Sequence, residues 1–406
     1  MLGRLIPLVA VTLILLATLR GLHRPWWDQK RVRYGLVGVA VMTAAGMALR
    51  SAAMGRNTTY EPNPALAMVG SLIGGAGAVF LLALFFTLPL AGLVRWATAR
   101  VIREVPAPAP ATPPVPSEEA PPPRPVSRRR MIEAASLVLP STGLGLGAVG
   151  IAGAFVPTAI VPRRFSYANL PEQLRGLKIL QLTDVHLGAF MDPAGIADIV
   201  ERAREHRPDL VVLTGDFCDH LPFLEPALRA VETLDPRLGI YACMGNHEHY
   251  RGAVPTRRTY AKTNIELLDD AHRVLDVDGA RLVVSGIDDP VGSRQRGDDF
   301  SYERAIDTAL SGAPSEAFHL GLSHRPKGFV ALASRGIDLT LSGHTHGGQL
   351  GAGDRSLFEP FAEGSFLRGE YEQNGKRLYT SSGAGHWLAF RLDCPSEAAL
   401  VTLENT

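Results

Sequence analysis

Four long uncharged runs lie in the first 162 positions of the chain: Leu5–Leu19, Tyr34–Leu49, Ala65–Val94 and Ala134–Val161. A helix that crosses the hydrocarbon core of a bilayer needs roughly 20 apolar residues. The third and fourth runs exceed this length, whereas the first two fall short of it. The pattern predicts an all-α transmembrane region, with three membrane-spanning helices in residues 1–103 and a fourth in residues 131–162.

The two shorter runs each allow an alternative interpretation. Leu5–Leu19 also has the length of the apolar core of a signal peptide. Tyr34–Leu49 could instead lie at the membrane interface. The number of spans therefore rests on these two segments, and one miscounted span would reverse the orientation of everything that follows.

Lys and Arg are concentrated in the first and third connections between the apolar runs. Residues 20–33 and the connection that begins at Arg95 are rich in them, whereas the connection after the second run has only Arg50 and Arg56. Cytoplasmic loops carry such an excess of positive charge. With four spans, residues 163–406 are expected on the extracytoplasmic side of the membrane.

The segment 104–130 is rich in proline and arginine, and we expect an extended, semi-rigid linker there. It leads into "SRRRMIEAASLVLP" (Ser127–Pro140), which resembles a twin-arginine export signal. Glu133 departs from that pattern, because such signals usually exclude acidic residues at this place. The alternative is that these arginines anchor the fourth helix on its cytoplasmic side.

From residue 163 onward, short apolar runs alternate with helical patterns, which predicts an α/β or mixed α+β domain over residues 163–406. "LKILQLT" (Leu177–Thr183) has the pattern of a buried strand. The next segment, "DPAGIADIVERAREHRPD", predicts a helix with Asp192 as its cap and Pro193 at its first position. Its apolar residues that are expected to face inward are Ile196, Ile199, Val200 and Ala203. Five further strand candidates follow: "LVVLTG", "GIYACMG", "RLVVSGI", "FHLGLS" and "IDLTLSG".

Charge and cysteine content exclude some classes of function. The chain has 41 Lys and Arg against 40 Asp and Glu, so nothing in its net charge indicates a nucleic-acid partner. Its three cysteines are odd in number and form no CxxC pair. Neither a disulfide framework nor a zinc–thiolate site is therefore expected, and no feature identifies a protein partner.

Polar side chains follow the predicted strands at the point where each strand ends. In chain order these residues are Asp184 and His186, Asp216, Asn246 and His247, His324, and finally His344 and His346. Side chains two positions apart on an extended strand share a face, and ligands in open α/β sheets gather beyond the carboxyl ends of strands. Each motif alone is weak, but together they predict a shared metal site.

The donor types narrow the choice of metal. Oxygen and imidazole donors without thiolates suit Mn, Fe, Zn, Co or Ni. These donors are too many for one catalytic ion that must keep an open position, so we expect two divalent cations.

The ordered set D-x-H, GD, GNHE, a lone His and GHTH resembles the calcineurin-like metallophosphoesterase superfamily, over about residues 175–405. "GHTHGGQ" and "GIDDP" further resemble its membrane-linked subgroup. The resemblance implies two mixed β-sheets in a sandwich flanked by helices. It also implies two metal sites, one formed by Asp184, His186, Asp216 and His346, the other by Asp216, Asn246, His324 and His344.

The same resemblance implies hydrolysis by a hydroxide that bridges the two ions, with His247 as general acid. Glu248 is expected either to support an imidazole or to be a solvated acid. Arg325 either meets the substrate phosphate or is a surface arginine. The late turn "SSGAG" lacks the arginine that the subgroup usually has there, and His386 and Trp387 follow it as candidates to line the cleft.

These residues predict a membrane-anchored, dimetal phosphoesterase that hydrolyses phosphodiester or phosphomonoester bonds, with a lipid or envelope phosphoester as candidate substrate. One alternative is a cytoplasm-facing pyrophosphatase or phosphodiesterase that acts on a nucleotide or a nucleotide-linked lipid. Another is a metal-binding but inactive scaffold. The fold indicates the reaction, whereas the loops that set specificity carry no motif for a ligand.

Overall fold

The computed structural model describes residues 2–406 except 55–62, 102–127, 363 and 387. Two compact units emerge from the contacts within the chain. One comprises residues 1–48 and 73–149, and the other comprises residues 49–72 and 150–406. Most of the predicted linker 104–130 lies outside the described residues, and only its last three residues begin helix α5.

The four apolar runs lie on helices α1 (Leu2–Leu22), α3 (Lys30–Ala53), α4 (Pro64–Val101) and α5 (Arg128–Gly153), and the short helix α2 (Arg24–Trp27) connects the first two. Among the described residues, three stretches are long and apolar enough to cross a membrane: Lys30–Ala53, Pro64–Ala97 and Ser136–Gly153. The first predicted span lies on α1, where the apolar stretch Ile6–Leu22 is shorter. Leucines of α1, α3 and α4 form the core of this unit: Leu15, Leu19, Leu36, Leu81 and Leu88.

Helix α5 ends earlier than the predicted fourth segment, 131–162. It stops at Gly153, and residues 159–161 already belong to strand β1 (Ala159–Tyr167). Pro157 prevents the helix from continuing toward residue 162, because the ring of a proline disfavours helical backbone at the residue before it. The uncharged run Ala134–Val161 thus combines a helix with the start of the following domain.

The second unit contains two six-stranded sheets. The first has the order β1, β14 (Glu397–Asn405), β2 (Lys178–Leu182), β3 (Leu210–Thr214), β4 (Ile240–Cys243), β5 (Ile265–Leu267). The second has the order β12 (Gly369–Gln373), β13 (Lys376–Thr380), β9 (Leu339–Ser342), β8 (Phe318–Ser323), β7 (Ala280–Ile287), β6 (Ala271–Val277). Both sheets are mixed: β2 to β5 and β7–β8–β9–β13 are parallel, while β14 is antiparallel to β2 and β6 to β7.

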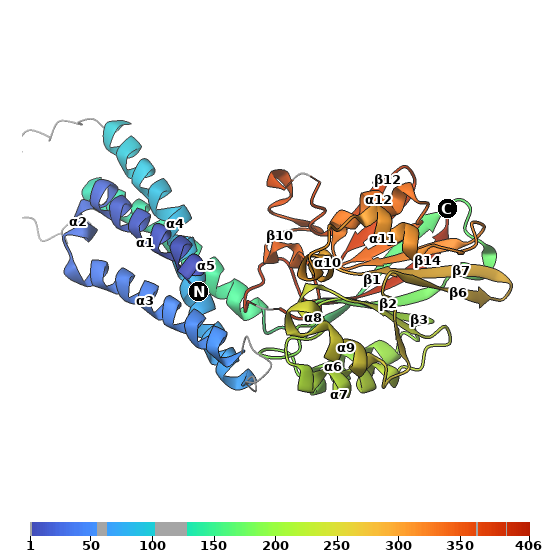
Figure 1. Ribbon diagram of the computed structural model, residues 1–406. Coiled ribbons are helices and arrows are strands. Elements are labelled where there is room, and N and C mark those ends of the chain that lie inside the picture. The colour runs from blue at the N-terminus through green and yellow to red at the C-terminus, as the bar shows by residue number, and fades with distance from the viewer. Residues whose placement is uncertain (1, 55–62, 102–127, 363, 387) are drawn as a thin grey trace, which may run out of the picture. The chain divides into compact units, whose positions relative to one another are not determined.

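Alternating side chains of the strands build two layers of core. Ile179 and Val212 pack against Leu320 and Leu341 of the other sheet. Their neighbours in the sequence point the opposite way, as the two-residue period of a strand requires, and pack under helices α6 (Pro193–Arg204) and α7 (Leu221–Glu232). Helices α11 (Tyr302–Ala309) and α12 (Phe329–Ser334) cover the second sheet (Figure 1). The predicted sandwich of two mixed sheets flanked by helices is confirmed.

Helix α6 has the predicted cap. Asp192 accepts a hydrogen bond from the backbone N–H of Gly195 at 2.8 Å, and Pro193 occupies the first helical position. The buried face consists of the four predicted residues: Ile196, Ile199, Val200 and Ala203. The smaller elements of this unit are α8 (Asn246–Arg251), α9 (Ala253–Tyr260), α10 (Pro290–Arg296), β10 (Gly351–Ala352) and β11 (Arg355–Ser356).

Candidate dimetal centre

The carboxyl ends of five strands meet at one edge of the sandwich. Strands β2, β3 and β4 of the first sheet and β8 and β9 of the second each end just before one of the polar motifs. Because parallel strands deliver their carboxyl ends to the same edge, residues that are 160 positions apart come into contact. The eight side chains brought together are Asp184, His186, Asp216, Asn246, His247, His324, His344 and His346.

One cluster consists of Asp184, His186 and His346, whose ligand atoms all lie within 4.8 Å of one another. The Nε2 atoms of His186 and His346 are 3.0 Å apart. Nε2 of His346 is also 3.4 Å from Oδ1 of Asp184. Two buried imidazole nitrogens that face each other beside a carboxylate need a proton or a cation between them, and a divalent cation fits this arrangement.

A second cluster consists of Asp216, His324 and His344, again with ligand atoms within 4.8 Å of one another. Nε2 of His324 lies 3.3 Å from Oδ2 of Asp216 and 3.1 Å from Nδ1 of His344. The same Oδ2 atom of Asp216 is 3.9 Å from Nε2 of His186 in the first cluster. Asp216 is therefore the carboxylate that the two clusters share.

The backbone at this edge is held in an uncommon conformation. Asp184, His186 and Asp216 have φ values of 51°, 51° and 50°, and His344 and His346 have 71° and 49°. For residues other than glycine this left-handed region costs energy, and it persists only where the surroundings enforce it. Here the N–H of His344 donates to both carboxylate oxygens of Asp184, at 3.0 and 2.8 Å. Strained backbone of this kind is typical of functional sites.

Two glycines permit the close approach of these loops. Gly215 has a φ of 82° and precedes Asp216 directly. A Cβ atom on Gly245 would lie 2.3 Å from Oδ1 of Asp216. The glycines of the GD and GNH motifs are thus required by space as well as by turn geometry.

His247 lies beside the shared carboxylate. Its backbone N–H donates to Oδ1 of Asp216 at 2.8 Å, and its Nε2 is 3.8 Å from Oδ2. Burial disfavours the charged imidazole, but the carboxylates of Asp216 and Asp219 outweigh it and raise the pKa of His247 to about 9. In the absence of metal this imidazole therefore carries a proton at neutral pH.

Asp219 is a site residue that the sequence reasoning missed. Its carboxylate lies 2.6 Å from Nδ1 of His247 and 3.1 Å from Nδ1 of His186. It also accepts hydrogen bonds from the guanidinium of Arg251. The feature of the sequence that could have identified Asp219 is its place as the second aspartate of "GDFCD", three positions after Asp216. Nothing in the local pattern showed that it would reach two histidines from different strands.

Both expectations for Glu248 are wrong. This side chain is buried, and it contacts no imidazole through a hydrogen bond among the described residues. Instead its carboxylate accepts from four backbone N–H groups, those of Asp216, Phe217, Cys218 and Gly245, at 2.7–3.0 Å. Glu248 therefore shapes the loop that presents Asp216.

Arg325 lies beside the second cluster and is only partly exposed, so it is not an ordinary surface arginine. Its guanidinium bonds Asp289 of "GIDDP" at 2.7 Å and lies 2.9 Å from Nε2 of His344. It also donates to Oδ1 of Asn246 at 3.3 Å. An arginine so placed can meet an anionic group at the metal clusters with its remaining hydrogen-bonding capacity.

The late turn "SSGAG" packs directly against the first cluster. The N–H groups of Ala384 and Gly385 donate to the carbonyl oxygens of Thr183 and Asp184, each at 2.9 Å. The buried Arg391 donates to the carbonyl of Ser382 at 2.9 Å and holds the turn from the other side. Arg391 is the second residue that the sequence reasoning missed. The neighbouring Trp387 lies outside the described residues.

The donor set agrees with the expected metals. Each cluster combines imidazole nitrogens with carboxylate oxygens, a set that suits first-row divalent ions. The three cysteines are buried and form no disulfide, and none belongs to a metal cluster of the described residues. The residues present therefore fit two divalent cations without thiolate ligands.

Residues 177–348 match the family model of the calcineurin-like phosphoesterases. An uncharacterized metallophosphoesterase of Helicobacter pylori is 32% identical over 56% of this chain and 60% of its own length. A transmembrane protein with a metallophosphoesterase domain from Danio rerio is 30% identical over 64% of this chain and 60% of its own length. The match thus spans about three fifths of these two relatives.

An uncharacterized metallophosphoesterase of Aquifex aeolicus is 30% identical over 56% of this chain, and the match covers 85% of that protein. The residues matched by the family model, 177–348, include the strand ends that carry both clusters. The predicted family is therefore confirmed: this chain belongs to the calcineurin-like phosphoesterases.

Proposed function

We propose that this protein is a membrane-anchored phosphoesterase that depends on two divalent cations and hydrolyses phosphodiester or phosphomonoester bonds. The observation that carries the proposal is the position of Asp216, whose Oδ2 atom lies near histidines of both clusters. One cation would take Asp184, His186, Asp216 and His346, and the other Asp216, Asn246, His324 and His344. When bound, such a pair polarises a phosphoryl oxygen and lowers the pKa of a bound water.

The residues around the clusters support the remaining roles. His247 holds a proton beside Asp216 and is placed to deliver it to the leaving oxygen of an ester. Arg325 extends toward the second cluster and can bind a phosphoryl oxygen. Asp219 fixes the orientation of the His247 ring through its Nδ1 atom.

The membrane attachment is part of the same proposal. Three helices have the length and composition of membrane spans, and α1 would be a fourth. With four spans, the distribution of Lys and Arg supports a phosphoesterase domain outside the cytoplasm. A relative from Danio rerio is also named as a transmembrane protein with this domain.

The test uses the full chain in lipid nanodiscs, stripped of metal and reloaded with Mn²⁺. Hydrolysis of bis(4-nitrophenyl) phosphate and of 4-nitrophenyl phosphate is followed by absorbance, with the Asp216→Ala protein as blank. We expect metal-dependent turnover above that blank. Two bound metals without turnover of either ester would contradict the enzyme proposal and favour a metal-binding scaffold.

A further inference from the structure

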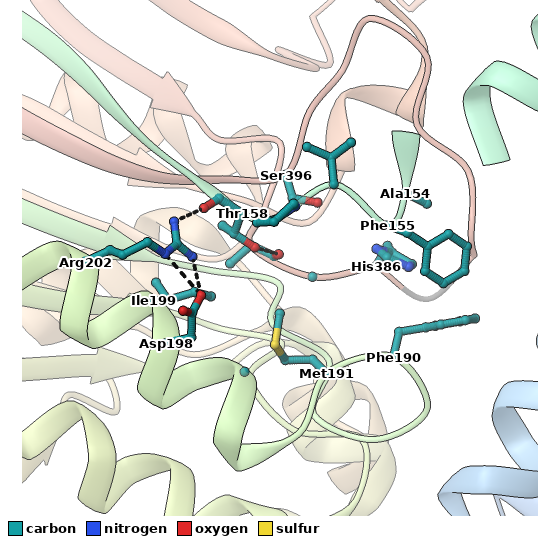
Figure 2. A pocket seen from close by; sticks show the side chains of 15 residues that line it. Ala154, Phe155, Thr158, Phe190, Met191, Asp198, Ile199, Arg202, His386 and Ser396 are labelled. Carbon is teal, nitrogen blue, oxygen red and sulfur yellow. Dashed lines mark hydrogen bonds and ion pairs between the residues drawn. The ribbon is translucent and has the colours of Figure 1, made fainter. Parts of the chain in front are cut away.

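A pocket of about 200 Å³ opens beside the first metal cluster, between the start of helix α6 and the chain that leads into β1 (Figure 2). This volume is below the roughly 300–1,000 Å³ of pockets that enclose a whole drug-sized ligand. The pocket therefore fits one segment of a larger molecule. Its wall includes Phe155, Val156, Phe190, Met191, Ile199 and His386.

Most of this wall is apolar, and its charged groups are already paired. Arg202 forms an ion pair with Asp198 at 2.8 Å and donates to the carbonyl of Thr158. The hydroxyl of Thr158 donates in turn to the carbonyl of Ala384 at 2.8 Å. These groups have little left to offer a charged ligand, so the pocket suits an apolar one.

His386 is the exception within this wall. His386 is only 7% exposed, and neither nitrogen of its ring has a hydrogen-bond partner among the described residues. Burying a polar group without a hydrogen-bond partner is unfavourable. The ring lies beside Phe190, with ring centroids 4.7 Å apart, and near Phe155 (Figure 2). A ligand in the pocket could satisfy these nitrogens with a neutral hydroxyl or carbonyl group.

The pocket and the first metal cluster share two loops. Phe190 and Met191 follow His186 within five positions on the loop after β2. On the other side, His386 directly follows Gly385, whose N–H bonds the carbonyl of the candidate ligand Asp184 at 2.9 Å. A phosphoester whose phosphate lies between the clusters can therefore extend an apolar substituent into the pocket.

The wall of the pocket begins where the last candidate span ends. Ala154 directly follows Gly153, the last residue of the span Ser136–Gly153. The five residues 154–158 can reach at most about 18 Å, even when fully extended. Phe155 and Val156 are 55% and 58% exposed at this place. An aliphatic chain of a membrane lipid would thus find an apolar entrance close to the bilayer.

We propose that this pocket binds an aliphatic chain of an amphiphilic phosphoester, with His386 hydrogen-bonded to a hydroxyl, ester or amide group near the start of that chain. The inference rests on the proposed phosphoesterase function and names the class of its substrate. The phosphate occupies the dimetal centre, and the chain occupies the pocket.

The first experiment compares two water-soluble diesters, methyl 4-nitrophenyl phosphate and hexyl 4-nitrophenyl phosphate, with the Mn²⁺-loaded full chain in nanodiscs. Each buried methylene strengthens binding about fourfold. If two or three of the five additional methylenes of the hexyl ester are buried, kcat/KM should be on the order of tenfold to a hundredfold higher than for the methyl ester. The Phe190→Ala protein should lose most of this ratio. The matched control is Phe361→Ala, an exposed phenylalanine of the same domain outside the pocket lining, which should keep it.

The ratio of kcat/KM for the hexyl ester to kcat/KM for the methyl ester tests the pocket proposal independently of the phosphoesterase proposal. Equal kcat/KM for both esters, or a ratio that Phe190→Ala leaves intact, would overturn the pocket proposal while the phosphoesterase function stands. If neither ester is hydrolysed, the phosphoesterase proposal fails, and the pocket proposal is tested separately by the binding of an alkyl phosphate. A decyl phosphate that carries a diazirine on its chain would then be photo-crosslinked and located by mass spectrometry. Labels within residues 154–158, 190–199 or 384–386 support the pocket, whereas labels confined to α1–α5 contradict it.

Discussion

The carboxylate of Asp219 lies 2.6 Å from Nδ1 of His247, and its other oxygen lies 3.1 Å from Nδ1 of His186. One aspartate therefore orients both the proposed proton donor and a proposed metal ligand. Partners of this kind fix the tautomer and the ring orientation of a ligating or acidic histidine. The proposed proton donor and the first cluster are consequently coupled through a residue that belongs to neither candidate metal cluster.

Asp219→Asn should lower kcat by roughly 10- to 100-fold. The Asp219 carboxylate is one of the groups that raise the pKa of His247, so its loss lowers that pKa. The protonated fraction of His247 then declines at a lower pH, and the basic limb of the kcat–pH profile moves to lower pH. Glu201→Gln, which also removes one carboxylate charge but lies outside the pocket lining, is the matched control. An unchanged basic limb would show that Asp219 does not act through His247.

Substitutions of Asp216 and His247 should show that metal binding and proton transfer depend on different residues. Asp216→Ala is expected to lose both metals and all activity, because both clusters share this carboxylate. His247→Ala is expected to retain metal and to slow turnover roughly 10²–10⁴-fold. Metal content by mass spectrometry and kcat are measured on the same preparations. Loss of metal from His247→Ala would mean that this histidine is itself a ligand.

Metal binding should release protons and strengthen as the pH rises. In the metal-free protein, burial disfavours a charged His324, but Asp216 and Asp184 outweigh it and raise the pKa of His324 to about 10. A histidine must be neutral to bind a metal, so Mn²⁺ has to displace this proton between pH 6 and 8. Calorimetry in two buffers of different ionisation enthalpy measures the release. A heat of binding that is independent of the buffer would refute this prediction.

Glu248→Gln should destabilise the phosphoesterase domain by about 2–4 kcal/mol. Each carboxylate oxygen of Glu248 accepts two backbone N–H groups. An amide replaces one oxygen by an N–H₂ group, which would face two donors in a buried place. The midpoint of unfolding of the metal-free protein is measured in urea. The exposed Glu201→Gln is the control and should change the midpoint little.

The full chain should remain in the membrane fraction after washing with high salt and with alkaline carbonate. Three candidate spans bury far more apolar surface in a bilayer than a peripheral domain does. Immunoblotting of pellet and supernatant gives the result. Recovery of the intact chain in the supernatant would contradict its assignment as a membrane-spanning protein.

Much of the candidate site could be predicted from the sequence, because its residues directly follow strands. An apolar run specifies its strand locally, and a parallel sheet brings the strand ends to one edge. Asp184, His186, Asp216, Asn246, His324, His344 and His346 could therefore be grouped before any contact was known. The buried face of α6 followed in the same way from helical periodicity.

The sequence by itself thus determined the apolar helices, the strand ends and the donor types, since each depends on neighbouring residues along the chain. Only the tertiary structure decided which carboxylate orients His247, what Glu248 binds, how Arg391 holds the turn at Asp184, and where the pocket at His386 opens. Each of these contacts joins segments from different elements. They depend on strand register and on the paths of loops, which local patterns of hydrophobic and polar residues do not specify.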